Sequence, residues 1–273
     1  MIKGNAMSQI HARFANAVLC SCALIVLTSA QAVWAADDAV SCAKTGLGPQ
    51  APRDILERVA GTNAVTFKAP ATAQMHLCNI HFHKYAEHRA AGYKEQASQK
   101  GFVCNGKTPP KEAGHGSASS GCPGIANGDT IEIHWVFTTC DVKPGPTLDG
   151  CISCANRQLR VEARVFYLAN DGADFANLVN YKDSKFVAYK EGKVSPPAAG
   201  DAVEYMGSKT GAGYSKDTCS GLPVTWNVSP ACGPLKLKSI NDWCGKDQAI
   251  FKVDHPHPAR ELVKEGKLLS AIK

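Results

Sequence analysis

Cysteine content is the feature of this chain that most constrains how it can fold. The 273 residues include 12 cysteines, and all but Cys20 and Cys22 follow residue 36. The ten that remain are Cys42, Cys78, Cys104, Cys122, Cys140, Cys151, Cys154, Cys219, Cys232 and Cys244. An even number of cysteines at this density is typical of chains that fold in an oxidising compartment, where disulfides close the loops.

The sequence does not determine how these cysteines pair. We expect the local pairs Cys104–Cys122 and Cys219–Cys232, because each flanks a loop rich in Gly, Ser and Pro. Cys151-Ile-Ser-Cys154 has a spacing that suits redox chemistry or half of a zinc site, but no second CxxC completes a four-thiolate site. We therefore expect these two thiols also to lie in disulfides.

The first 35 residues have the pattern of a secretory signal peptide. Lys3 and Arg13 are their only charged residues, and an apolar stretch over residues 14–32 precedes the small-residue site Val33-Trp34-Ala35. A transmembrane anchor is the alternative, but polar residues interrupt the stretch and no basic cluster follows it. We expect cleavage to leave an exported protein, periplasmic or secreted, that has no membrane contact.

Composition excludes several classes of protein. Hydrophobic residues make up 44% of the chain and charged residues 20%, a globular balance rather than a disordered or fibrous one. The net charge is +6, and the basic residues are scattered with no run of four. We therefore expect no nucleic-acid partner. None of these features fixes the oligomeric state.

The pattern of apolar residues after residue 36 favours strands over helices. Strands are predicted over residues 75–83, 130–138, 158–168 and, more briefly, 224–228. Short helices are expected at 85–100 and 258–265, and loops at 105–129 and 191–221. The sequence thus predicts a mainly β protein, α+β at the margin. We expect a single domain (36–273) on a large twisted, mostly antiparallel sheet with long loops and a few short helices.

Histidines are concentrated on two of the predicted strands. His81 and His83 stand two apart in Asn79-Ile-His-Phe-His, so they project from one face of a strand. His134 follows Glu132 at the same spacing, and a carboxylate or amide there can accept a ring N–H and fix the tautomer. Three neutral imidazoles with an open position form the ligand set of catalytic zinc, so we predict one Zn²⁺ per chain.

Other interpretations of the histidines stay open at this point. His134 lies in an apolar segment, where a histidine taken alone is more often a buried, hydrogen-bonded core residue, and an isolated His-x-His pair also arises by chance. His255-Pro-His257-Pro is expected to form a surface turn. His115 lies in a Gly/Ser loop.

The order of the motifs resembles a known enzyme family. Asn79-Ile-His-Phe-His83, then Glu87-His88, then Glu132-Ile-His134 resemble the zinc core of alpha-type carbonic anhydrases. Tyr205-Met-Gly-Ser-Lys-Thr210 and Val224-Thr-Trp226 resemble that family's Tyr-x-Gly-Ser-x-Thr loop and the strand after it. The residues from Cys78 to His88 are more similar to the delta class. The resemblance spans about residues 75–228 and implies a carbonic anhydrase with an alpha-carbonic-anhydrase-like fold over residues 36–273.

The resemblance implies the reversible hydration of carbon dioxide to bicarbonate and a proton, by attack of zinc-bound hydroxide. The zinc ligands would be His81, His83 and His134, with Asn79, Glu132 and His88 behind them. Thr210 would accept a hydrogen bond from the hydroxide and donate its own proton to Glu87. The residues implied for the carbon dioxide pocket are Val136 and Trp226.

Some residues depart from the alpha pattern. The span from His83 to His134 is longer, and Lys209 replaces the apolar residue before Thr210. No histidine lies between His11 and His76, where the alpha class has its proton shuttle. The shuttle is therefore unassigned, with buffer, the loop histidine or another group as possibilities.

Two other functions compete with this interpretation. His81-x-His83-x3-Glu87 fits the first motif of an exported cupin-like metalloprotein, in which the glutamate would bind the metal. The flanking glycines and the second cupin motif are missing, however. A non-enzymatic, disulfide-rich metal-binding protein would instead use His255, His257 and the CxxC motif.

Overall fold

The computed structural model describes residues 39–44, 46–97, 100–106, 122–170, 200–211, 213–244 and 251–272. The predicted signal peptide and His115 lie outside these residues, so both stay predictions. Within the described part of the chain, no helix is long and apolar enough to cross a membrane.

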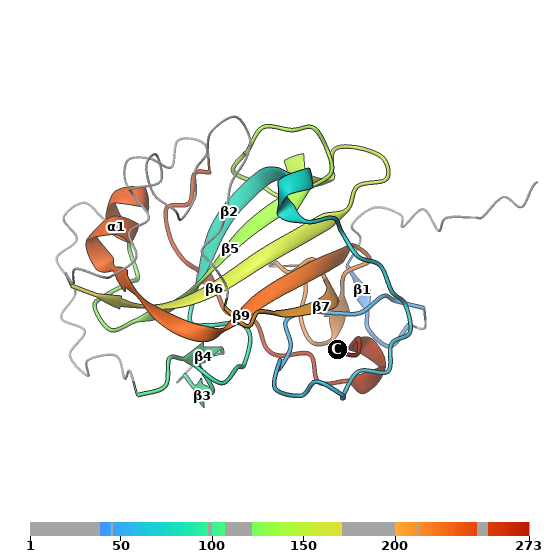
Figure 1. The fold of residues 1–273 in the computed structure, drawn as a ribbon, viewed down its shortest axis with the longest axis horizontal. Coiled ribbons are helices and arrows are strands. Elements are labelled where there is room, and N and C mark those ends of the chain that lie inside the picture. The colour runs from blue at the N-terminus through green and yellow to red at the C-terminus, as the bar shows by residue number, and fades with distance from the viewer. Residues whose placement is uncertain are drawn as a thin grey trace, which may run out of the picture. The chain divides into compact units, whose positions relative to one another are not determined.

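A six-stranded mixed sheet is the main element of the fold (Figure 1). Its strands, in spatial order, are β10 (His257–Pro258), β2 (His76–Lys84), β5 (Thr130–Thr138), β6 (Leu159–Ala169), β9 (Pro223–Lys236) and β7 (Val203–Ser208). The pairs β2–β5, β5–β6 and β7–β9 are antiparallel, whereas β10–β2 and β6–β9 are parallel. The prediction of a mainly β, mostly antiparallel sheet is confirmed.

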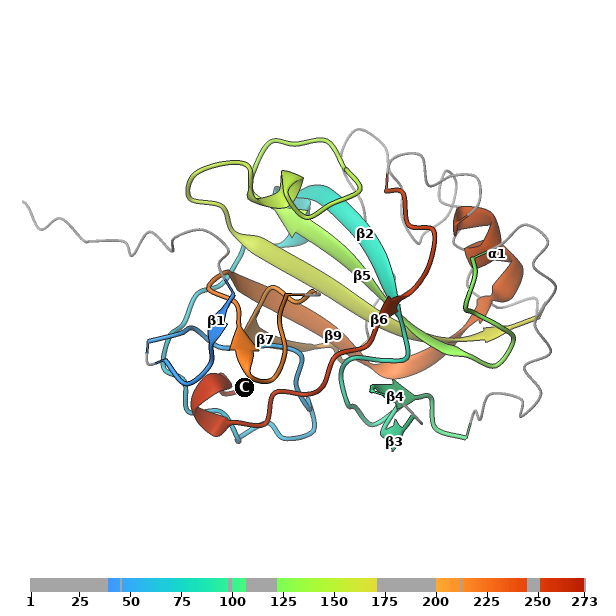
Figure 2. The same cartoon turned by 180° about the vertical axis from the view of Figure 1, so that it is seen from behind.

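Short elements surround this sheet. Two small antiparallel sheets pair β1 (Val40–Ser41) with β8 (Thr218–Cys219) and β3 (Glu95–Gln96) with β4 (Phe102–Val103). The helix α1 (Leu237–Asp242) follows β9 directly, and 3-10 turns span Thr72–Gln74, Gly150–Ile152 and Gly266–Leu268. Seen from behind, the C-terminal segment crosses one face of the sheet and contributes β10 beside β2 (Figure 2).

Side-chain alternation places the apolar core on both faces of the sheet. On β5, Ile133 and Trp135 belong to a buried cluster on one face, and Val136 belongs to a second cluster on the other. All nine residues of β5 are buried, because both faces of the strand are covered. The histidines of β2 and β5 share the face of the second cluster.

In several segments the secondary structure differs from the prediction, because long-range hydrogen bonds determine it. The expected helix at 85–100 is wrong over its described part, because Ala86 exchanges backbone bonds with Phe102 and β3 lies in this stretch. The expected helix at 258–265 is also wrong, because Pro258 belongs to β10 and the nitrogen of Val263 bonds to the oxygen of Pro52. The predicted loop at 191–221 contains β7 and β8, and the short strand at 224–228 is part of the longer β9.

Five disulfides cross-link the described residues, and four of them join segments that are 73 to 177 residues apart. The pairs are Cys42–Cys219, Cys78–Cys151, Cys104–Cys232, Cys122–Cys244 and Cys140–Cys154. The local pairs expected from the loops are therefore wrong, since the fold brings each of those cysteines to a more distant partner. Both cysteines of the CxxC motif are bridged, as predicted. Five disulfides indicate an oxidising environment.

Candidate metal centre

Strand register brings the predicted zinc ligands together. His81 on β2 stands opposite His134 on β5, and His83 stands opposite Glu132. The ring centroids of the three histidines lie 4.7 to 5.3 Å apart. All three histidines are buried, with exposed fractions of 8% or less.

One nitrogen of each ring is held by an oxygen that can only accept a hydrogen bond. The Nδ1 of His81 lies 2.7 Å from Oδ1 of Asn79, whose amide NH₂ donates to the carbonyl of Gly145. The Nδ1 of His83 donates to the carbonyl of Pro258 at 3.2 Å. These acceptors fix the tautomer of each ring and leave Nε2 as a lone pair.

The third ring is held through its other nitrogen, Nε2 instead of Nδ1. The Nε2 of His134 lies 2.8 Å from Oε1 of Glu132, so Nδ1 carries the lone pair. That Nδ1 lies 3.2 Å from Nε2 of His81, so two lone pairs face each other. A cation between them removes this repulsion. Zinc–nitrogen bonds of about 2.0–2.1 Å in a tetrahedral site place two ligand nitrogens about 3.3 Å apart, which fits this distance.

A buried ring nitrogen without a partner also points to a cation. Among the described residues, Nε2 of His83 has no hydrogen-bond partner although it is buried. Three groups at this site have ligand atoms within 4.8 Å of one another: His81, His83 and His257; His83, Glu87 and His134; and His88, Glu132 and His134. None contains all three predicted ligands, but the first two share His83, and His81 contacts His134 directly. The residues present therefore fit a metal ion.

Glu132 anchors a chain of hydrogen bonds behind His134. Its Oε1 also accepts from Nδ1 of His88 at 2.7 Å, and its Oε2 accepts from the backbone nitrogens of Glu87 and His88. The Nε2 of His88 lies 2.8 Å from the hydroxyl of Tyr205. Burial alone would raise the pKa of Glu132, but His88 and His134 together hold it well below its ordinary value. The carboxylate therefore stays charged and stabilises the orientation of His134.

Glu87 lies within the site, where one of its carboxylate oxygens is within 4.8 Å of ring nitrogens of His83 and His134. Its Oε1 accepts from the backbone nitrogen of Arg260 at 3.1 Å and lies 3.5 Å from Nδ1 of His83, the nitrogen already engaged. Its Oε2 is buried without a partner among the described residues. Burial raises the pKa of this carboxyl group.

A cavity of about 580 Å³ opens onto the histidines. His81, His83 and Thr210 line it. Its apolar wall consists of Pro146, Leu148, Val253, Pro258 and Ala259. Val136 and Trp226 do not line the cavity. The ring of Trp226 lies 5.1 Å from the rings of both His88 and His134 and supports them from behind.

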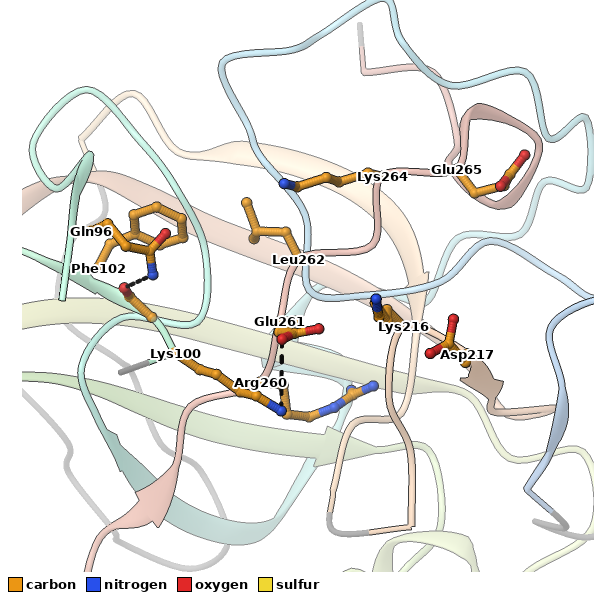
Figure 3. Close-up of a pocket in the computed structure, with 11 residues that line it drawn as sticks. Gln96, Lys100, Phe102, Lys216, Asp217, Arg260, Glu261, Leu262, Lys264 and Glu265 are labelled. Carbon is orange, nitrogen blue, oxygen red and sulfur yellow. Dashed lines mark hydrogen bonds and ion pairs between the residues drawn. The ribbon is translucent and has the colours of Figure 1, made fainter. Parts of the chain in front are cut away.

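A second cavity, of about 700 Å³, adjoins the first one (Figure 3). The two share Lys100, Lys216, Arg260 and Glu261. Figure 3 shows the side chain of Lys100 extending towards Glu261, with 3.9 Å between the charged atoms, close to Arg260. Three of these four shared residues are cationic, so the boundary between the cavities attracts anions.

Sequence reasoning missed part of the site. His257 does not lie in a surface turn: it belongs to β10, where it pairs with His83, and its ring stacks on that of His81. Pro258 and Arg260, which hold His83 and Glu87, were also missed. The isolated His-Pro-His-Pro segment was the available signal, because proline favours extended backbone. Nothing in the sequence indicated which strand it would join.

The buried histidines predict a dependence of stability on pH in the metal-free protein. Burial, together with His134, lowers the pKa of His83 from 6.5 to about 3. Between these values the unfolded chain binds a proton at His83 that the folded chain does not, so stability falls as the pH falls. We expect the free energy of unfolding, measured by urea denaturation, to decrease between about pH 6 and pH 4.5 by about 1.4 kcal/mol per pH unit for each such histidine.

The matched variants isolate this contribution. His83→Gln should flatten the profile, whereas His76→Gln, at the more exposed start of β2, should leave it unchanged. A free energy of unfolding that is constant over this pH range would contradict the burial of a neutral His83.

Solved carbonic anhydrase structures are similar to this chain at low sequence identity. A hyperthermostable carbonic anhydrase from an active hydrothermal vent chimney is 15% identical, with 78% of this chain and 84% of that chain covered and a TM-score of 0.29. The alpha-carbonic anhydrase of Thermovibrio ammonificans, in complex with sulfanilamide, is 14% identical, with 77% and 83% covered and a TM-score of 0.30. No curated protein matches the chain.

The family comparison is more specific than these similarities. A family model described as delta carbonic anhydrase matches residues 72–239, which are 168 of the 273 residues. This span contains both histidine strands, the Glu87-His88 dipeptide and Thr210. The chain belongs to the delta carbonic anhydrase family, whose reaction is the reversible hydration of carbon dioxide to bicarbonate and a proton.

Proposed function

We propose that this chain is an exported, zinc-dependent carbonic anhydrase in which His81, His83 and His134 hold the ion. The observation that carries the proposal is the set of three acceptors that leave one lone pair free on each ring. Neutral nitrogen ligands in this number are typical of catalytic zinc, which keeps one position for water. The short distance between the free nitrogens of His81 and His134 supports a single shared ion.

Zinc held in this way lowers the pKa of a bound water from about 15.7 to about 7, a magnitude for which carbonic anhydrases are themselves the reference case. The three histidines are neutral and leave the positive charge of the site uncompensated. Burial lowers the pKa of His81 and of His83, which keeps both rings unprotonated at neutral pH. Protons therefore compete little with the metal at these nitrogens.

The cavity supplies a site for the substrate beside the ligands. Its apolar wall includes Leu148, Val253 and Ala259. This wall suits carbon dioxide, which is uncharged and has only weak hydrogen-bond acceptors. Arg260, Lys216 and Lys252 lie in the same cavity and favour the bicarbonate anion that forms. The site thus combines an apolar surface for the substrate with cationic groups along the exit.

We further propose that Thr210 orients the attacking hydroxide and that Glu87 receives the proton of the threonine hydroxyl. Thr210 lines the cavity with His81 and His83, and Glu87 has a buried oxygen without a partner among the described residues. No hydrogen bond joins Thr210 to Glu87 in the described part of the chain, so the pairing rests on the resemblance. A threonine that donates to a carboxylate can only accept from the hydroxide, which directs a hydroxide lone pair at the substrate carbon.

We propose that the catalytic domain spans residues 36–273 and that residues 1–35 direct export to the periplasm or the exterior. The five disulfides support an oxidising compartment. Contacts made by Pro258 and Arg260 support a domain that extends beyond residue 239, because these residues hold His83 and Glu87.

Stopped-flow hydration of carbon dioxide by the mature protein tests this function. We expect rapid hydration that disappears with a chelator and returns with stoichiometric zinc. His134→Ala should abolish both zinc retention and hydration, because it removes one of three ligands. His76→Ala, a histidine on the same strand as His81 but outside the site, should retain both. A folded, zinc-loaded protein without hydration would refute the proposal.

Removal of the charge at Glu132 should weaken zinc binding while the ligands stay in place. We expect Glu132→Gln to raise the zinc dissociation constant by roughly 10–100-fold, as is usual when the partner of a ligating histidine changes. Glu162→Gln is the matched control, because Glu162 is a buried carboxylate of the same sheet that bonds to Arg160 and Arg164 instead. Competition with a chromophoric chelator measures both. An equal loss in both variants would show a general effect on folding.

A further inference from the structure

A fourth histidine lies on the same face of the sheet as the proposed ligands. His257 on β10 is in parallel register with His83, and paired residues of neighbouring strands project to the same side. Its ring stacks on that of His81, with 5.2 Å between centroids and 23° between planes, and lies 5.5 Å from that of His83. His257 also lines the cavity, together with His81 and His83, and is more exposed than either of them.

The four histidines form two sets of three that have two histidines in common. His81 and His83 are common to both sets, with His134 on the inner side and His257 on the outer side. Ligand atoms of His81, His83 and His257 lie within 4.8 Å of one another. His134 is 1% exposed, whereas His257 is exposed to solvent. Each set offers three imidazoles to a metal ion, and the outer set contains the most exposed of the four histidines.

The two sets do not converge on one point. The ring of His81 contacts the rings of both His134 and His257, whereas these two rings make no contact with each other in the described structure. A tetrahedral zinc site needs all its ligand nitrogens about 3.3 Å apart, so His257 is not placed as a fourth ligand to an ion on His134. The arrangement instead offers two overlapping positions for one ion.

The nitrogens of His257 are available for this purpose. Within the described part of the chain, no hydrogen bond engages either nitrogen of its ring. His255 differs, because its Nδ1 lies 2.5 Å from Oδ1 of Asp254 and it belongs to none of the described ligand groups. His255 is therefore a suitable control position for an effect that requires His257 to bind the metal ion.

We propose that His81, His83 and His257 form an outer site that captures the divalent metal ion before His134 binds it. In the transfer, the bond from the metal to a nitrogen of His257 breaks and a bond to Nδ1 of His134 forms. His81 and His83 stay bound throughout. Every ligand is neutral, and Glu132 already holds the proton-bearing Nε2 of His134, so no proton or electron moves. The inference rests on the proposed function, because it concerns loading of the same ion.

Kinetics of metal uptake test the capture site directly. Metal-free protein is mixed with Co²⁺ in a stopped-flow instrument, and the visible absorption of the bound ion is followed. We expect His257→Ala to slow association by about tenfold or more, which corresponds to a barrier about 1.4 kcal/mol higher. Release uses the same route and should slow similarly, so the dissociation constant should change little.

Matched variants separate ligation from other roles of the ring. His257→Phe keeps an aromatic ring that can stack on His81 but has no nitrogen, so it should load as slowly as His257→Ala. His255→Ala should load at the wild-type rate. His134→Ala should still bind Co²⁺ weakly through the outer set, and the double variant His134→Ala/His257→Ala should lose this binding.

Several outcomes would overturn the inference. Wild-type uptake rates in both His257 variants would show that the outer histidine does not capture the ion. Slow uptake in His257→Ala alone would show that stacking matters instead, and equal slowing in His255→Ala would show a general effect at the rim. A wild-type protein that binds no Co²⁺ or Zn²⁺ would refute the proposed function itself, whereas normal loading and hydration with unaffected His257 variants would refute only the capture site.

Discussion

The hydrogen bonds that fix the three imidazole tautomers are the interactions on which the rest of this site depends. Asn79, the carbonyl of Pro258 and Glu132 each accept from one ring nitrogen and leave the other as a lone pair. Because the three lone pairs are buried together, the site is unfavourable without a cation and favourable with one. The choice of acceptors thus determines both the position of the metal and the charge of its ligands.

These acceptors come from distant parts of the chain, which explains why the fold has so many long-range links. The carbonyl of Gly145 orients Asn79, and the loop that carries Gly145 is tied to β2 by the disulfide between Cys78 and Cys151. Pro258 reaches His83 only because β10 adds to the edge of the sheet beside β2. The disulfides and the C-terminal strand therefore contribute to the metal centre as well as to stability.

The sequence predicted the parts of the site that depend on local periodicity. His81, His83 and His134 were placed on one face because strands alternate with period two, and the spacing of Asn79 and Glu132 gave their partners. What was missed depends on long-range pairing: His257 and Pro258 in β10, the strand at 203–208 and four disulfides with separations of 73 to 177 residues. Local sequence patterns do not show which distant segment pairs with the edge of a sheet, or which distant cysteine forms a disulfide with a given thiol.

A crystal structure of the zinc-loaded protein, with anomalous diffraction collected at the zinc absorption edge, tests the central claim most directly. The account predicts one strong anomalous peak per chain, coordinated by Nε2 of His81, Nε2 of His83 and Nδ1 of His134, with a fourth position open to the cavity. An ion at rest on His257 in place of His134, or coordinated by Glu87, would contradict it.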